Sequence, residues 1–282
     1  MYTKGYKTAI SLPPLLWVSI LLFLPYVLIL CTSFWSVSSD QVLVHTWDFS
    51  SYRQLVTNPM YGRVLFRSAK IAGTVTLLAL FLAYPLAYFL SFHCEKKQKW
   101  LYQLVILPLW VSYLVRGYAW KTILGGDGVL NGFLQYLHIT NEPLEFLLYS
   151  PFAVVLTLTH IYTPFVFLPV YAALANIHKS LLEASNDLGA SHFTTFWKVI
   201  FPLSMPGILT GSIFAFLLTL GDFLAPQLVG GASGMMISNV VVSLFGAAYN
   251  WPLGSAIAMV ILLLVATLLA VVNRYEKKWG TK

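Results

Sequence analysis

A chain of 282 residues that is 58% hydrophobic and only 10% charged has too few charged side chains to cover a soluble globule of its size. Its net charge of +7 does not indicate nucleic-acid binding, because the basic residues form short clusters beside apolar stretches instead of one continuous face. With a mean hydropathy of +0.75, the composition predicts a protein that crosses a membrane several times.

Six apolar stretches are each long enough to cross about 30 Å of hydrocarbon, which takes roughly 20 helical residues. Lys4 and Lys7 precede the first stretch, but its full span length favours a retained helix over a cleaved signal peptide. The third and fifth stretches contain polar or proline residues, so their ends are the least sharply defined. We expect an all-α polytopic fold with spans near 11–34, 69–91, 101–120, 151–174, 204–228 and 253–273.

The distribution of Lys and Arg predicts the orientation of these spans, because cytoplasmic loops carry an excess of both. With a cytoplasmic N-terminus, both termini and the segment 175–203 are cytoplasmic. The inner segments then hold Lys4, Lys7, Lys96, Lys97, Lys99, Lys179, Lys198, Arg274, Lys277, Lys278 and Lys282. The outer segments hold fewer: Arg53, Arg63, Arg67, Arg116 and Lys121.

A polar stretch at 180–202 interrupts the apolar sequence. Ser180 and Glu183 have capping-box spacing, and Gly189 suits the left-handed residue that ends a helix, so a short helix is expected between them. Four of its residues share one face: Leu181, Leu182, Ser185 and Leu188. This face requires a docking surface, which is either the membrane and its own helix bundle or a partner protein.

The same stretch resembles the EAA loop of the permease subunits of ABC importers. Glu183-Ala184-Ser185, Gly189 and Val199-Ile200-Phe201-Pro202 match the spacing of that motif at every anchor. Ser185, Val199 and Phe201 are mild replacements for Ala, Ile and Leu. The resemblance implies a type I ABC-importer transmembrane domain. Its expected divisions are a first helix with an outer loop (1–68), a five-helix core (69–273) with a coupling loop at 178–202, and a cytoplasmic tail (274–282).

In that family the loop forms a coupling helix that is held by an ATPase subunit. The residues expected to take part here are Glu183, Ala184, Ser185, Asp187, Gly189 and Pro202. No G-x-x-x-x-G-K-[ST] sequence is present to hold ATP phosphates, so ATP and Mg²⁺ are expected on a separate chain. The sequence shows no nucleophile elbow and no clustered metal-ligand spacing, which argues against an enzyme and against a cofactor or metal bound by this chain.

The resemblance also implies partners for a pore-forming subunit. These are two ABC ATPase subunits in the cytoplasm, a second permease subunit that is related but different, and a periplasmic or surface solute-binding protein, all in or at the cytoplasmic (inner) membrane. The segment 47–52 and the pattern around 181–190 and 202–207 resemble the polyamine (spermidine/putrescine) permeases. Ferric iron, thiamine and phosphonate permeases share the EAA loop and remain alternatives, as does, from another class, a secondary transporter.

Four residues near the outer ends of two spans are candidates for a substrate pathway. Asp222 is the only acid that falls within a predicted span, where an ionised carboxylate is costly unless it is paired or faces water. It either lines a pathway for a cation or, if the span ends near Gly221, is a rim residue that caps a helix or pairs with Arg116. Trp110, Tyr113 and Arg116 in the third span either contact ammonium groups or belong to an interfacial belt.

Overall fold

The computed structural model describes residues 4–38, 42–94 and 97–280, so Lys96 and Lys282 lie outside the described residues. Side chains are described from residue 12 to residue 274 of these ranges. The chain divides into two compact units. Unit 1 comprises residues 1–62 and 240–266, and unit 2 comprises residues 63–239 and 267–282.

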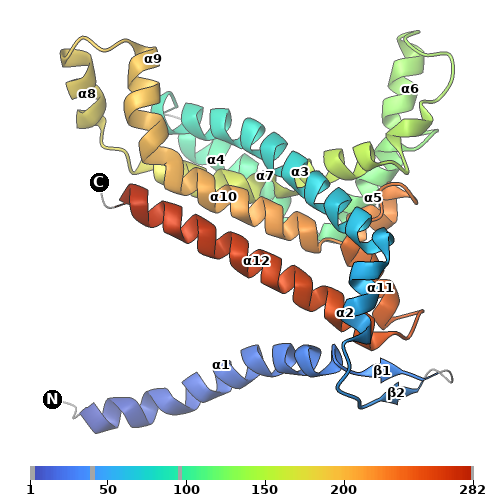
Figure 1. Cartoon of the computed structure of the whole chain (residues 1–282). Coiled ribbons are helices and arrows are strands. Elements are labelled where there is room, and N and C mark those ends of the chain that lie inside the picture. The colour runs from blue at the N-terminus through green and yellow to red at the C-terminus, as the bar shows by residue number, and fades with distance from the viewer. Residues whose placement is uncertain (1–3, 39–41, 95–96, 281–282) are drawn as a thin grey trace. The chain divides into compact units, whose positions relative to one another are not determined.

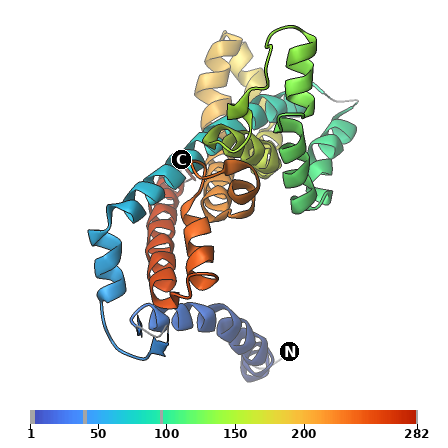
Figure 2. The ribbon, with the colours of Figure 1, turned by 90° about the vertical axis from the view of Figure 1, so that its right-hand side faces the viewer.

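Unit 1 is built on α1 (Lys4–Thr32), which leads into a small hairpin of β1 (Ser36–Val37) and β2 (Leu43–Val44). The hairpin is antiparallel, with Ser36 opposite Val44. The next helix is α2 (Ser50–Thr57), whose Tyr52 hydroxyl forms a 2.8 Å hydrogen bond with the hydroxyl of Ser33 at the end of α1. Thr32 bonds Ser255 in α12 (Trp251–Gly280) at 2.7 Å, so the end of α1 lies beside the start of α12 (Figures 1 and 2).

The main helices of unit 2 are α3 (Pro59–Phe92), α7 (Pro151–Ala175) and α10 (Phe201–Gly221). Shorter elements join them. These are α4 (Gln98–Ile106), the 3₁₀ helix η1 (Leu107–Trp110), α5 (Tyr113–Leu124), α6 (Val129–Tyr136), the 3₁₀ helix η2 (Glu145–Leu147), α8 (Lys179–Asp187), α9 (His192–Thr195), and the π-helices η3 (Phe196–Ile200) and η4 (Pro226–Gly230). The last short helix, α11 (Ile237–Phe245), begins in unit 2 and belongs to unit 1 from residue 240 onward.

Among the described residues, five helices are long and apolar enough to cross a membrane: Leu12–Thr32, Pro59–Phe92, Pro151–Ala175, His192–Gly221 and Trp251–Arg274. The fourth predicted span, 151–174, is confirmed at both ends. The second starts at Pro59 instead of residue 69. The predicted start of the fifth span at residue 204 and its end at 228 are wrong, because one continuous helix runs from His192 to Gly221.

The third predicted span, 101–120, is not a single helix. It consists of α4, η1 and α5, and the backbone is extended at Val111 and Ser112 between them. Pro108 contributes to the break, since proline has no N–H to donate to the preceding turn. None of these pieces is long enough to span on its own, so the count of six spanning helices is not confirmed, whereas the all-α architecture is.

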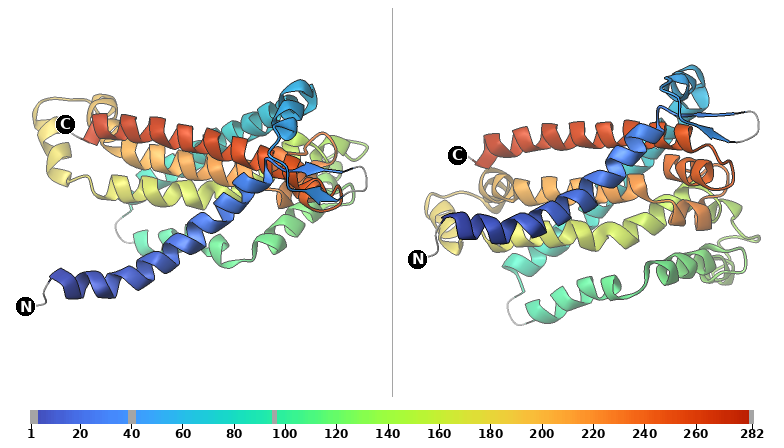
Figure 3. Two further views of the ribbon diagram at one scale, coloured as in Figure 1. Left: turned by 60° about the horizontal axis from the view of Figure 1, so that its bottom comes forward. Right: turned by 90° about the horizontal axis from the view of Figure 1, so that it is seen from below.

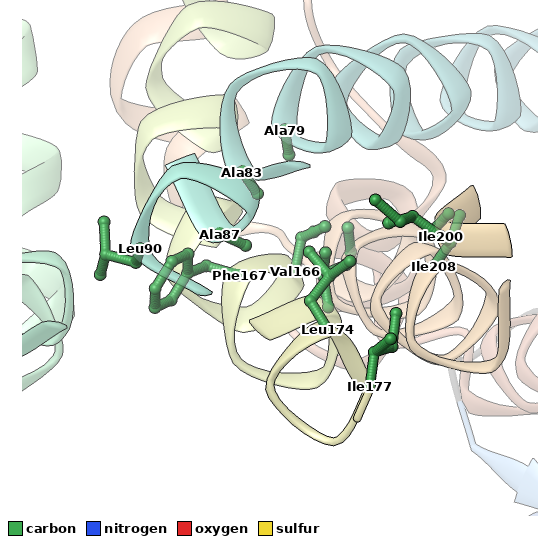
Figure 4. Packing of buried hydrophobic residues seen from close by; sticks show 12 residues of the cluster. Ala79, Ala83, Ala87, Leu90, Val166, Phe167, Leu174, Ile177, Ile200 and Ile208 are labelled. Carbon is green, nitrogen blue, oxygen red and sulfur yellow. The ribbon is translucent and has the colours of Figure 1, made fainter. Parts of the chain in front are cut away.

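The core of unit 2 forms where α3, α7 and α10 meet (Figure 4). Ala79, Ala83 and Ala87 are fully buried on α3 and belong to the same core cluster as Val166 and Phe167 of α7. On α10, a Cβ atom added at Gly207 would lie 2.5 Å from the carbonyl oxygen of Pro169 on α7. The two backbones are therefore in direct contact, and small residues are required at the crossing.

Unit 2 has two distinct ends. Figures 1 and 3 show α8 and α9 beyond one end of α7 and α10, and α6 beyond the other. The C-terminal end of α12, which belongs to unit 2 from residue 267 onward, lies at the same end as α8. The α8–α9 segment and α6 therefore lie at opposite ends of unit 2.

Candidate functional site

The predicted short helix is present as α8, but its start differs from the prediction. His178 is the residue before the helix, in an extended conformation, and its side chain makes no capping hydrogen bond. Ser180 is the second residue of α8. It therefore has helical backbone geometry and cannot act as an N-cap, which makes the capping box with Glu183 wrong.

The predicted end of α8 is confirmed. Gly189 has φ of +74°, the left-handed conformation that L side chains adopt only at a cost. The N–H of Ala190 donates to the carbonyl oxygen of Ser185 at 3.1 Å, and the N–H of Gly189 donates to that of Asn186 at 2.8 Å. Together these two bonds form a Schellman motif, which satisfies the last carbonyls of the helix and turns the chain towards α9.

The predicted four-residue face of α8 is split between two environments. Ser185 is buried, and its hydroxyl forms a 2.8 Å hydrogen bond with that of Thr195 on α9. Leu182 packs against the core of unit 2. Leu181 and Leu188 point to solvent instead, with exposed fractions of 45% and 88%. The expectation of one shared docking face is therefore wrong: α8 is fixed to its own bundle by one edge and presents the rest outward.

The outward residues of α8 include most of those predicted to couple to an ATPase. Glu183, Ala184, Asp187 and Gly189 are exposed, and so is Leu188. The sequence analysis did not identify Thr195, the hydrogen-bond partner of Ser185. The only available signal is that a hydroxyl buried at position 185 needs a hydrogen-bond partner, and this does not say which residue supplies it. Ser185 stands where the EAA motif has Ala. Its hydrogen bond with Thr195 explains how a hydroxyl group can be buried at this position.

Pro202 lies in the first turn of α10, directly after the π-helix η3. A proline within a continuous helix lacks an N–H and crowds the carbonyl four residues before it. The π-helical turn of η3 is wider than an α-helical turn and lies at the position of this crowding. It makes room for the proline ring, and the helix continues from His192 to Gly221 without a break. Pro202 is therefore part of this helix, and not of a loop that precedes it.

At the other end of α10, Asp222 is the residue that follows the last helical turn, and it is only 6% exposed. Its Oδ2 atom accepts hydrogen bonds from the Tyr162 hydroxyl, at 2.6 Å, and from the Tyr113 hydroxyl. Its Oδ1 atom accepts one from the backbone N–H of Ala225 at 3.1 Å. The Ser238 hydroxyl donates to the backbone carbonyl of Asp222. Asp222 thus links α5, α7 and the end of α10.

Asp222, Tyr113 and Tyr162 line an open cleft with a volume of about 340 Å³. The remaining lining is mostly apolar and consists of Leu217, Leu218, Gly221, Phe223 and Leu224. The cleft therefore has an acidic, hydroxyl-bearing wall and a wall of hydrocarbon.

The other two candidate pathway residues are placed differently. Arg116 lies over the ring of Tyr113, 5.9 Å from its centroid, and its Nη1 donates a long 3.5 Å hydrogen bond to the carbonyl oxygen of Ile161. Arg116 forms no ion pair with Asp222 within the described chain, so the suggested pairing of these two residues is wrong. Trp110 is 84% exposed and does not line the cleft.

Tyr162 is the member of this site that the sequence analysis missed. A tyrosine within an otherwise apolar span needs a hydrogen-bond partner for its hydroxyl, and that need is the available signal.

On the same helix, His160 accepts a 3.1 Å hydrogen bond at Nδ1 from the indole N–H of Trp120. An imidazole nitrogen that accepts carries no proton, so this histidine is neutral in the structure.

The comparison with protein families now decides the class of the chain. The family model described as "Binding-protein-dependent transport system inner membrane component" matches residues 5–275. The chain belongs to this family. It is therefore a multi-pass inner-membrane permease component, and as a transport subunit it has a pore-forming role instead of an enzymatic one.

Individual relatives cover nearly the whole chain. The spermidine/putrescine transport system permease protein PotB of Haemophilus influenzae is 35% identical over 266 residues, which cover 94% of this chain and 92% of the relative. The inner membrane ABC transporter permease protein YdcU of Escherichia coli is 38% identical over 276 residues, covering 93% of this chain and 87% of the relative.

The solved structures establish the fold. A chain of the bacterial alginate ABC transporter, crystallised in complex with an alginate pentasaccharide-bound periplasmic protein, aligns with a TM-score of 0.75 at 17% identity. The alignment covers 97% of this chain and 94% of that one. The expected type I ABC-importer transmembrane fold is thereby confirmed.

Proposed function

We propose that this chain is the permease subunit of an ATP-driven importer of polyamines, and that it forms one half of the translocation pathway for spermidine or putrescine. The observation that carries this proposal is the near full-length similarity to PotB, at 35% identity over 94% of the chain. The putative 2-aminoethylphosphonate transport system permease protein PhnU of Salmonella typhimurium is less similar, with 31% identity over 77% of this chain.

The energy for transport enters through α8, which an ATPase subunit holds on the cytoplasmic side. Two features of the structure support this role: α8 lies beyond the end of the helix bundle (Figure 1), and Glu183 and Leu188 on it are exposed. Burying the exposed leucine side chain against a protein partner is more favourable than leaving it in water. ATP and Mg²⁺ bind to the ATPase, and this chain contributes the mechanical contact.

The orientation follows from the same contact. Placing α8 in the cytoplasm also places the C-terminal end of α12 there, and it turns α6 towards the outside. The Asp222 cleft, which lies at the end of α10 away from α8, then also faces the outside. A solute-binding protein delivers its cargo on that outer side. A second, related permease subunit completes the pore, as the family resemblance implies.

Reconstitution tests this function. The chain is purified with its partner permease and ATPase, placed in liposomes with ATP inside, and given radiolabelled spermidine and the binding protein outside. We expect uptake that stops when ATP is omitted and that excess unlabelled putrescine inhibits. Because one relative is a putative 2-aminoethylphosphonate permease, 31% identical over 77% of this chain, that compound is tested as a competitor together with thiamine and ferric iron. ATP-dependent uptake of one of those solutes without uptake of spermidine would refute the proposed substrate.

A further inference from the structure

We propose that Asp222, together with the hydroxyl oxygens of Tyr113 and Tyr162, binds one terminal primary ammonium group of the transported cation. This inference rests on the proposed function, since it assigns a site on this chain to the cargo. It also assigns a use to a carboxylate that the coupling role of α8 does not require.

The first argument is the unbalanced charge of Asp222. All three groups that reach its carboxylate are neutral donors: two tyrosine hydroxyls and one backbone N–H. Within the part of the chain that the structure describes, no Lys or Arg forms an ion pair with it. Arg116, the cation on the neighbouring face of Tyr113, does not line the cleft. A carboxylate that is 6% exposed and has no counter-ion attracts a cation strongly.

The second argument is the number of acceptors that remain. A carboxylate offers about four lone-pair sites, and three donors occupy three of them here. Each tyrosine hydroxyl gives its proton to Asp222 and keeps its own lone pairs for a further donor. A primary ammonium group has three donors and no acceptor. The free site on the carboxylate and the two hydroxyl oxygens are three acceptors of the matching kind.

The third argument is the shape and position of the cleft. Its other walls are hydrocarbon from Leu217, Leu218, Phe223 and Leu224, which suits the methylene chain that follows a terminal ammonium group. The cleft lies at the end of a 30-residue helix, about 45 Å from the start of that helix beside α8 at 1.5 Å per residue. A cargo that enters from the side opposite α8 reaches this cleft before it crosses the membrane.

Protection of a cysteine in the cleft from a thiol reagent tests the site directly. Cys31 and Cys94 are first replaced by Ser, and Leu218, which is partly exposed in the cleft, is replaced by Cys. The assembled transporter in liposomes is labelled with a soluble maleimide at increasing spermidine concentrations. At ten times the dissociation constant, labelling should be about tenfold slower, because only about one site in eleven remains empty. Hexane-1,6-diol, which has the chain but no charge, should give no protection.

Two variants separate a binding role from a purely structural one. In the Leu218→Cys background, Asp222→Asn should remove the protection by spermidine while labelling without spermidine stays unchanged. If this variant does not assemble, Tyr162→Phe replaces it, since it leaves the other two hydrogen bonds of Asp222 in place. The matched control is Phe214→Cys, one turn earlier on α10, which is exposed but does not line the cleft and should not be protected.

The outcomes are distinct. Absence of spermidine protection at Leu218→Cys, in liposomes that import spermidine with ATP, would overturn the site and leave the proposed function standing. Protection that persists in both Asp222→Asn and Tyr162→Phe would overturn the assignment to these residues. Liposomes that import no polyamine would refute the proposed function itself.

Discussion

Truncation of Leu188 to Ala should weaken binding of the partner ATPase without destabilising the permease. This side chain is 88% exposed at the end of α8, so its loss removes almost no packing from the chain itself. If an ATPase buries it, the lost transfer free energy is about 2 kcal/mol, the usual value for a leucine side chain. That energy corresponds to an increase of about 30-fold in the dissociation constant. The measurement is a titration of detergent-solubilised permease dimer with the purified ATPase.

Ile139→Ala is the matched control for this variant. Ile139 is 64% exposed and follows α6, at the end of unit 2 opposite α8 (Figure 1). It should leave ATPase affinity unchanged, and both variants should retain the wild-type melting temperature. An unchanged dissociation constant for Leu188→Ala would show that this residue is outside the ATPase contact and would refute the assigned orientation of α8.

Three further changes in and around α8 have distinct expected effects. Glu183→Ala should lower spermidine uptake and ATPase retention while the permease still inserts, as assayed by transport and by co-purification; wild-type values in both assays would contradict a coupling role. Gly189→Ala should destabilise the end of α8 by about 1 kcal/mol, because alanine is strained at positive φ, and faster amide exchange across α8 would report it. Ser185→Ala leaves the buried Thr195 hydroxyl without its partner and should cost about 1–3 kcal/mol, as read from the thermal midpoint. The double variant Ser185→Ala/Thr195→Val should recover most of that loss, and a double variant no more stable than the single one would argue against this account.

The features that the sequence predicted correctly depend on local signals. Gly189 ends α8 because only glycine takes positive φ without strain, whatever the rest of the chain does. The span 151–174 was placed correctly because Ser150-Pro151 marks its start, with the Ser150 hydroxyl accepting from the N–H of Ala153. Both signals lie within a few residues of the feature that they determine.

The predicted starts of two spans are wrong because the helices begin with polar residues. The helix that ends at Gly221 starts at His192, yet its first two turns carry His192, Thr194, Thr195 and Lys198. A search for apolar stretches leaves out such turns, because it finds the residues that suit the hydrocarbon of a membrane and not the full length of the helix. The same reason explains why α3 begins at Pro59. The Ser180–Glu183 pattern failed for a different reason: the helix had already begun at Lys179.

The site at Asp222 could be located from the sequence but not assembled. An acid in or beside an apolar span is visible as an anomaly, and the structure ends the helix at Gly221, directly before Asp222. Its partners Tyr162 and Tyr113 lie 60 and 109 positions away along the chain, on two other helices. Only the packing of α5, α7 and α10 brings them together, and from the sequence Arg116 was the one side chain suggested as a partner of Asp222.

The two candidate sites share one structural element. The Ser185–Thr195 hydrogen bond attaches α8 to the first turns of the helix that starts at His192, and Asp222 follows the last residue of that same helix. The carboxylate in turn holds Tyr162 of α7 and Tyr113 of α5. If the ATPase displaces α8 during transport, as proposed, the displacement therefore acts on a continuous helix whose far end carries the proposed cation site. A change in the separation of α10 from α5 or α7 at that end alters the three acceptors together, which would couple ATP-driven movement to release of the ammonium group.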